Sequence, residues 1–316
     1  YSRILTELQA SHCQLSERTR LELMLKAFER TAAYDAAISS YFLDLAVNQG
    51  VRSEWPAPQK LIMGFEKLQD LRYGENPHQK AAVYRDPRSV ACIAAAPQVA
   101  GEKELSYTNI LDADAAFRMT QELREDIATV IVKHTNPCGV AKGRTLSDSC
   151  QKALETDPVS AFGGVYAFTQ LVDVDTANLL SDKFVELILA PGYEPEALKI
   201  LSSKKNRRIL DISGNLSAVR PRCSEKNFRR ILGGILYQDS DEMLIDEQKL
   251  KVVTKRQPTE DESEGLKFGW KIVKHVKSNA IVLCSKEQLV SVGAGQMSRV
   301  DSVSYTHLTL PTNREV

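Results

Sequence analysis

Short apolar runs alternate with helical stretches along most of this chain, and this alternation constrains its fold more than any other feature of the sequence. The runs are rich in β-branched residues and are bounded by Gly, Pro or polar residues, as strands are. They lie at residues 61–65, 128–133, 164–169, 184–190 and 280–284. Helical spacing of apolar residues is found at 112–124, 147–155, 175–183 and 194–204, and a T-E-D-E capping-box sequence starts a further helix at 259. Strands that alternate with helices predict an α/β fold, with helices layered on a parallel or mixed sheet.

The start and the end of the chain do not share this alternation. Over residues 21–42, apolar side chains recur at three- and four-residue steps, which predicts an amphipathic helix whose apolar face is packed in a core. Residues 48–58 are rich in Gly, Pro and polar residues, so we expect a linker and a domain boundary there. From residue 304 the sequence SYTHLTLPTNREV has neither a helical nor a strand period. We expect a surface tail or unrelated sequence at this end.

Charge and cysteine usage exclude several classes of protein. The chain has 41 Lys and Arg against 41 Asp and Glu, and a net charge of zero disfavours nucleic-acid and anionic-membrane binders, which need a basic excess. No apolar run is long enough for a membrane span, and no signal-peptide pattern opens the chain. The six cysteines form no C-x-x-C pair, which favours free thiols in a reducing compartment. We expect a cytoplasmic enzyme or binding protein, and a fragment, because the chain begins with Tyr1.

The sequence VKHTNPCG at residues 132–139 is the first of three polar clusters. A predicted strand runs into Lys133 and His134 and is expected to break at Asn136-Pro137, at a strand end where ligands usually bind in α/β sheets. Histidine transfers protons near neutral pH, and a neighbouring lysine can orient an anion or an oxyanion. A surface charge beside a turn residue is the alternative interpretation. The zinc deaminase signature is incomplete here, because no Glu follows His134 and residue 141 is alanine, so zinc is disfavoured.

Two further clusters are loops. RYGENPHQ at residues 72–79 contains Arg72, Tyr73 and His78, which could bind a nucleotide but also fit a solvated turn. The glycine turns SAFGG, at residues 160–164, and GAGQMSR, at residues 293–299, would allow a ligand to approach the backbone closely. No G-x-x-x-x-G-K-[ST] sequence is present, which excludes P-loop phosphoryl transfer.

Seven strings occur in one order: LRYGENPHQ, ELSYTNILDADAA, VIVKHTNPCGVA, TDPVSAFGG, VVTKRQPTE, VKSNAIV and GAGQMSRV. On these strings the chain resembles the bifunctional purine biosynthesis proteins of the bacterial type, over nearly all of residues 1–303. One activity of that family is phosphoribosylaminoimidazolecarboxamide (AICAR) formyltransferase, which transfers a formyl group from 10-formyltetrahydrofolate to the 5-amino group of AICAR. The other is IMP cyclohydrolase. The resemblance implies a zinc-free, cytidine-deaminase-like layered α/β fold.

The resemblance also implies roles for single residues. Lys133 and His134 match the formyl-transfer pair, in which the histidine handles the proton of the attacking amine and the lysine assists orientation and charge. Asn279 matches the asparagine that steadies the formyl oxygen. The implied substrate contacts are Arg72, Tyr73, His78, Gly163, Glu186 and Arg299, the last for the nucleotide phosphate. The family admits a monovalent cation, although the sequence identifies no ligands for it, and no other metal is implied.

Domain limits and partners follow from the same resemblance. Residues 1–53 would be the C-terminal end of a cyclohydrolase domain with a linker, residues 54–303 a formyltransferase domain incomplete at its C-terminus, and residues 304–316 an unrelated or disordered tail. We therefore expect no cyclohydrolase activity and weak or absent formyl transfer. The family implies a cytoplasmic homodimer with shared active sites and no nucleic-acid or membrane partner. A non-catalytic nucleotide-binding or dimerisation fragment is the alternative, and the presence of Lys133, His134 and Asn279 favours the enzyme.

Overall fold

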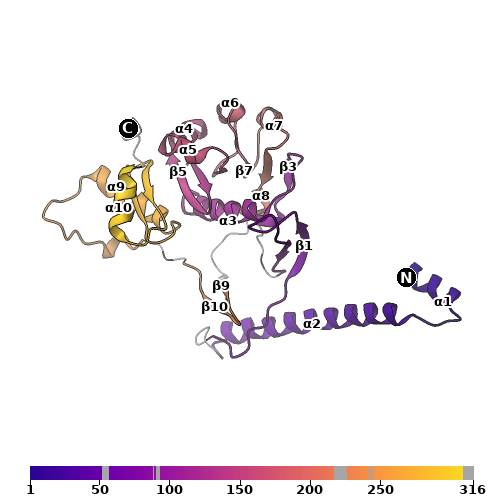
Figure 1. The fold of residues 1–316 in the computed structure, drawn as a ribbon. Coiled ribbons are helices and arrows are strands. Elements are labelled where there is room, and N and C mark those ends of the chain that lie inside the picture. Colours follow the sequence, from indigo (N-terminus) through magenta and orange to yellow (C-terminus); the bar gives the residue numbers. More distant parts are fainter. Residues whose placement is uncertain are drawn as a thin grey trace. The chain divides into compact units, whose positions relative to one another are not determined.

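A computed structural model describes residues 1–51, 57–87, 89, 93–216, 226–241, 243 and 245–308. The chain divides into two compact units (Figure 1), one of residues 1–66 with 86–88 and the other of residues 67–85 with 89–316. The units are thus separated between residues 66 and 67, whereas the sequence places a boundary between 53 and 54. Residues 52–56 of the predicted linker lie outside the described residues.

The described residues of the first unit form two helices, α1 (Ser2–Ala10) and α2 (Glu17–Asn48). Ser16 caps α2, since its side chain accepts a hydrogen bond from the Thr19 amide at 3.2 Å. The predicted helix is confirmed, but its predicted packing is not found in this unit, where Leu25 is 58% and Phe28 68% exposed. The strand predicted at 61–65 is also wrong, because residues 57–65 form no helix or strand and β1 starts at residue 66.

The second unit is built on a six-stranded mixed sheet, in the order β3-β8-β7-β6-β4-β5. Strands β6, β7 and β8 are parallel, whereas the β4–β6, β4–β5 and β3–β8 pairs are antiparallel. The strands are β3 (Gln98–Ala100), β4 (Ala128–Lys133), β5 (Asn136–Lys142), β6 (Val165–Phe168), β7 (Leu187–Ala190) and β8 (Arg208–Asp211). The predicted α/β fold with a mixed sheet is confirmed.

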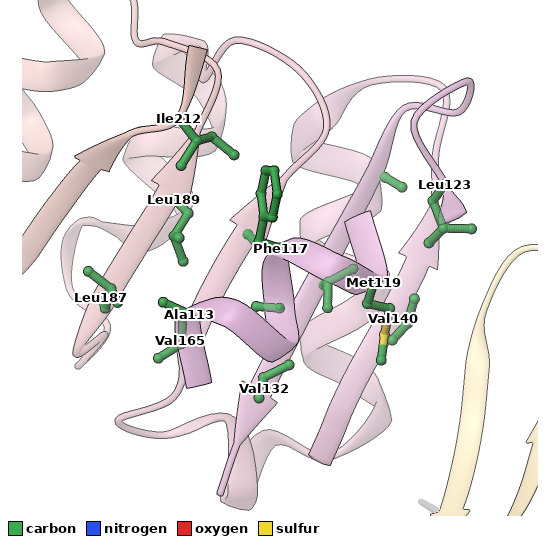
Figure 2. Close-up of a cluster of buried hydrophobic side chains, with 14 of the residues drawn as sticks. Ala113, Phe117, Met119, Leu123, Val132, Val140, Val165, Leu187, Leu189 and Ile212 are labelled. Atoms are coloured by element: carbon green, nitrogen blue, oxygen red, sulfur yellow. The ribbon is translucent and has the colours of Figure 1, made fainter. Parts of the chain in front are cut away.

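Helices cover both faces of this sheet, because its buried strands alternate apolar side chains between the faces. On one face, Phe117 and Met119 of α3 (Tyr107–Glu122) belong to one buried cluster with Val140 and Leu189 of the sheet (Figure 2), and α9 (Glu260–Val273) joins the same core. The other face carries α4 (Leu146–Thr156), α5 (Pro158–Ala161), α6 (Val174–Ser181) and α7 (Pro195–Ser202). Apart from α5, which was not predicted, these helices agree with the predicted ones to within a few residues, except that α3 begins five residues before 112. The capping box at Thr259 is confirmed.

Three two-stranded sheets complete the unit. They are β1 (Glu66–Leu71) with β2 (Ala81–Arg85), β9 (Lys226–Ile231) with β10 (Gly234–Asp239), and β11 (Ile281–Cys284) with β12 (Leu289–Gly293). Short helical turns lie at η1 (Ile93–Ala95), α8 (Ser213–Leu216) and η2 (Glu247–Lys249). The β11–β12 hairpin is joined to the edge strand β5 by a bridge between Ala141 and Gln288 and by a 2.7 Å hydrogen bond from Lys142 N to Glu287 O.

The last described helix, α10 (Arg299–Leu308), differs from the tail expected after residue 303. Thr306 is fully buried, and its carbonyl accepts a hydrogen bond from the Ser291 hydroxyl of β12. Burial against β12 therefore orders residues 304–308 despite their weak helical pattern, while residues 309–316 lie outside the described residues. Of the described helices, none combines the length and the apolar character that a membrane crossing requires.

A half-buried charge cluster joins α3 to the end of α9. Lys274 Nζ lies 2.7 Å and His275 Nε2 3.5 Å from Glu122 Oε1. Burial raises the pKa of Glu122, but the two basic side chains outweigh this and lower its pKa to about 2. A carboxylate whose pKa is lowered by folding stabilises the fold above its unfolded pKa, and that contribution is lost as the pH falls through the folded pKa.

We predict that Glu122→Gln lowers the free energy of unfolding of this unit at pH 7, by roughly 2–3 kcal/mol. The difference from the parent chain should shrink as the pH falls from 5 to 2, because the parent carboxylate is then protonated as well. Urea denaturation across this pH range measures it, with Glu125→Gln, an exposed carboxylate shortly after the end of α3, as the control. A difference that does not vary with pH would contradict the assigned pKa.

Candidate active site

The antiparallel pairing of β4 with β6 places the end of β4 beside the start of β6, where Val132 pairs with Val165. Glu186 directly precedes β7, and Arg208 is the first residue of β8. The predicted site residues on these strands therefore gather at the edge where the parallel strands begin. The sequence had suggested a strand end of the kind at which ligands usually bind in α/β sheets. Lys133 and His134 do lie at the end of β4, but β4 runs antiparallel to β6, so this end meets the starts of the parallel strands.

Lys133 and His134 lie at a hairpin turn, not at a break. His134 and Thr135 connect β4 to β5, with φ values of 52° and 62°. The break in strand structure expected at Asn136-Pro137 is wrong, because the strand β5 begins there. Proline is tolerated at this position since β5 is an edge strand of the sheet. Two-residue hairpin turns with positive φ favour Asn-Gly, and a left-handed conformation costs other residues about 1–2 kcal/mol each. This turn is therefore a strained element of the site.

The turn borders a cleft of about 220 Å³. The ammonium group of Lys133 donates a 2.8 Å hydrogen bond to the Phe162 carbonyl, which leaves two of its N–H groups for a ligand. The imidazole of His134 is exposed, and no described residue forms a hydrogen bond with it. Burial raises the pKa of the Cys138 thiol in the wall to about 12, so this cysteine is a poor nucleophile. The described residues that line the cleft are Lys133, His134, Asn136, Pro137, Cys138, Asp157, Ser160, Val292, Ala294, Gln296 and Tyr305.

Asn136 links the turn to the loop that carries Asn279. Its Nδ2 donates to the His134 carbonyl at 3.0 Å, and its Oδ1 accepts from the Lys277 amide at 3.1 Å. The Asn279 side chain donates from Nδ2 to two carbonyls, those of Gln296 and Met297, each at 3.1 Å. Both of its N–H groups are thus committed, and only the acceptor Oδ1 remains. This arrangement differs from the predicted one, in which Asn279 would donate to a formyl oxygen.

Gly163 lies at the start of β6 with a φ of 70°. Its amide donates a 2.8 Å hydrogen bond to the Phe184 carbonyl, and a Cβ at this position would lie 3.0 Å from Phe184 Cε1. The exposed rings of Phe162 and Phe184 contact each other next to this glycine, with centroids 5.1 Å apart. Next to them, Glu186 Oε1 accepts a 2.6 Å bond from the buried Arg208.

The remaining predicted residues are less closely connected to the cleft. Arg299 is the first residue of α10, and Ser302 in the same turn donates from Oγ to the Asn279 carbonyl at 3.3 Å. Arg72 and Tyr73 follow β1 and stack on each other, with 5.6 Å between the guanidinium carbon and the ring centroid. Neither they nor His78 are among the described residues that line the cleft. The described residues contain no group of three or more His, Cys, Asp and Glu side chains placed to hold a metal ion.

Four residues of this region were missed by sequence reasoning. Asp112 accepts hydrogen bonds from the turn, Asn136 was taken for part of a strand break, Phe162 flanks Gly163, and Arg208 holds Glu186. Asp112 and Asn136 do occur within strings typical of the family, but no spacing rule distinguishes them from surface residues. Their partners are far away in the sequence, so only the fold shows what they contact.

We predict that Gly163→Ala lowers the free energy of unfolding by about 1–2 kcal/mol, because alanine disfavours a φ of 70° and its Cβ crowds Phe184. Chemical denaturation measures this loss. Gly214→Ala is the matched control, since Gly214 lies in the short helix α8 and a Cβ there would meet no other atom within 4 Å. Equal stability of the Gly163 variant and the parent chain would show that this backbone conformation is not required.

Comparison with known proteins places these observations in context. The sequence model of the AICARFT/IMPCHase bienzyme family matches residues 1–307, and so extends past the expected limit at residue 303. The bifunctional purine biosynthesis protein PurH of Halalkalibacterium halodurans is 48% identical over 301 residues, which cover 95% of this chain and 56% of the relative. PurH of Bacillus cereus strain AH187 is 46% identical over 303 residues, or 96% of this chain and 57% of the relative. The chain therefore spans a little over half the length of these relatives.

Proposed function

Because this chain belongs to the AICARFT/IMPCHase bienzyme family, we propose that it carries the formyltransferase activity of these purine biosynthesis proteins. The reaction would transfer the formyl group of 10-formyltetrahydrofolate to the 5-amino group of AICAR. One observation carries the proposal: Lys133 and His134 line the same cleft as Gln296, whose carbonyl binds the Asn279 side chain. We assign only the transferase to this part of the family's length.

The chemistry requires a proton acceptor and a donor to an oxyanion. Attack of the aromatic amine on the formyl carbon forms a C–N bond and a tetrahedral intermediate with a negative oxygen and an ammonium group. The two free N–H groups of Lys133 supply donors where that negative charge develops. His134 accepts the ammonium proton, and its exposed, unpartnered imidazole is available for this step. Collapse of the intermediate breaks the bond to the folate nitrogen, which leaves with the proton that His134 accepted, so the imidazole is neutral again.

Asn279 has a different role in this proposal from the one expected. With both of its N–H groups bonded to backbone carbonyls, the side chain offers an acceptor, Oδ1. An acceptor suits the N–H of the attacking amine, so we assign Asn279 to orienting the amine and leave the oxyanion to Lys133.

The proposed substrate contacts rest on charge, hydrogen bonding and exposed aromatic rings around the cleft. Arg299 and the first amides of α10 both favour an anion, which agrees with a nucleotide phosphate at this helix start. Arg208 holds the Glu186 carboxylate beside Gly163, where it could accept a hydrogen bond from AICAR. The exposed Phe162 and Phe184 rings offer a surface on which a flat ring of the folate could pack. Arg72, Tyr73 and His78, and a monovalent cation, remain predictions from the resemblance, as does the cytoplasmic location.

We predict that His134→Ala lowers formyl transfer from 10-formyltetrahydrofolate to AICAR by about 10²–10⁴-fold while AICAR binding stays within a few-fold of the parent chain. Steady-state rates and calorimetric titration with AICAR measure the two quantities. His78→Ala, at a histidine outside the cleft lining, serves as a comparison. A parent chain that binds AICAR without turnover would favour the non-catalytic fragment, and a chain that does neither would refute the proposal.

We also propose that the chain forms the homodimer implied by the resemblance, with α2 in the contact surface. Leu25 and Phe28 are more than half exposed on this helix, as are several other of its apolar side chains. An exposed group of apolar side chains usually marks an interface. These exposed side chains also support the alternative interpretation, that the chain is a dimerisation module without activity.

Phe28→Glu should convert dimers to monomers at micromolar concentration, because a charge would replace a ring that the contact buries. Sedimentation velocity measures the change in mass. Lys26→Glu, a charge change on the same helix, is the control and should leave the dimer intact. A parent chain that is monomeric at all concentrations would contradict a dimer through α2.

A further inference from the structure

The His134–Thr135 turn requires an explanation, since its two residues do not favour the conformation they adopt. Both have left-handed φ values, and Thr135 is β-branched, which makes this conformation particularly rare. In two-residue hairpin turns of this kind, Asn and Gly are the usual residues. Something outside the turn must therefore favour its conformation.

The side chain of Asp112, in the second turn of α3, makes that contact. Its Oδ1 accepts a 2.6 Å hydrogen bond from the Thr135 amide, and its Oδ2 accepts a 3.3 Å bond from the His134 amide. Successive left-handed residues direct neighbouring amides to one side, where they form a concavity that binds anions. The Asp112 carboxylate is the anion that occupies it. Burial raises the pKa of Asp112, and the hydrogen bonds from Thr135 and His134 act in the opposite direction.

The aim of the His134 side chain depends on this contact. The His134 carbonyl is also held, by the Asn136 amide at 3.0 Å and by the Thr135 hydroxyl at 2.7 Å. The imidazole, in contrast, has no hydrogen-bond partner among the described residues. In many enzymes a carboxylate orients a catalytic histidine by accepting a bond from its ring. Here the carboxylate binds the backbone amide of the histidine instead, and so holds the point from which the side chain extends to the cleft.

We propose that Asp112 is the positioning residue of this site, which holds the His134–Thr135 turn in its left-handed conformation and thereby aims the His134 imidazole. The proposal rests on the proposed function for the catalytic role of His134. It assigns Asp112 no contact with the substrates. A loss of Asp112 should therefore change the rate of the chemical step more than the binding of AICAR, because a small displacement of a catalytic group can cost up to 100-fold in rate.

The test compares Asp112→Asn with Asp114→Asn, in which an exposed carboxylate of the same helix loses its ion pair with Arg118. Two readouts do not need activity. They are the NMR signals of the His134 ring and the hydrogen exchange of the amides of residues 134 and 135. We expect Asp112→Asn to shift the ring signals and speed amide exchange. It should lower kcat 10- to 100-fold and leave the KM for AICAR within about twofold. Asp114→Asn should change none of these.

A second variant separates positioning from general stability. Glycine adopts positive φ without support from other groups. Adding Thr135→Gly to Asp112→Asn should therefore restore the ring signals and raise kcat at least threefold above that of Asp112→Asn alone. If Asp112→Asn alone does not fold, the double variant is compared with Thr135→Gly instead. Unchanged ring signals and kcat in Asp112→Asn, or equal effects in Asp114→Asn, would overturn the proposal. If the parent chain shows no transfer, the proposed function fails, and the ring signals alone decide whether Asp112 positions His134.

Discussion

The antiparallel pairing of β4 with β6 is the constraint on which the rest of the site depends. It reverses the direction of one central strand, so that the end of β4 meets the starts of β6, β7 and β8 at one edge of the sheet. Lys133, Gly163 and Glu186 come to this edge from segments far apart in the sequence. The apolar side chains of the same strands are buried on both faces, so a slip in register would expose the core as well as disperse the site.

The polar contacts at this edge connect two loops that each carry part of the chemistry. Asn136 binds the backbone of both, from the His134 carbonyl to the Lys277 amide. The loop of Asn279 is in turn fixed by two side-chain bonds to the backbone of residues 296 and 297. In each of these bonds a side chain binds a backbone group. The fold itself therefore preorganises the site, without hydrogen bonds between these side chains.

Much of the fold follows from local patterns in the sequence. The buried runs at 128–133 and 164–169 predict β4 and β6 because central strands are apolar on both faces, and Thr259 with Glu262 predicts the start of α9 through a capping box. The direction of β4 could not be predicted, since a hairpin with a His-Thr turn lacks the Asn-Gly signal. Nor could the roles of Asp112, Asn136 and Arg208, whose partners are distant in the chain. Lys133 and His134 stand out because a basic pair at the end of a buried strand is unusual, whereas the loop of Arg72 and His78 fits a solvated turn as well and only the resemblance favours a binding role for it.

The central claim is that the His134 turn and the Asn279 loop form one AICAR-binding site. Titration of the isotopically labelled chain with AICAR, followed by amide NMR, tests it most directly. We expect the NMR signals of the amides of residues 133–136, 277–279 and 296–297 to shift together, with a single binding constant. Shifts confined to one of these loops, or two separate binding constants, would contradict it.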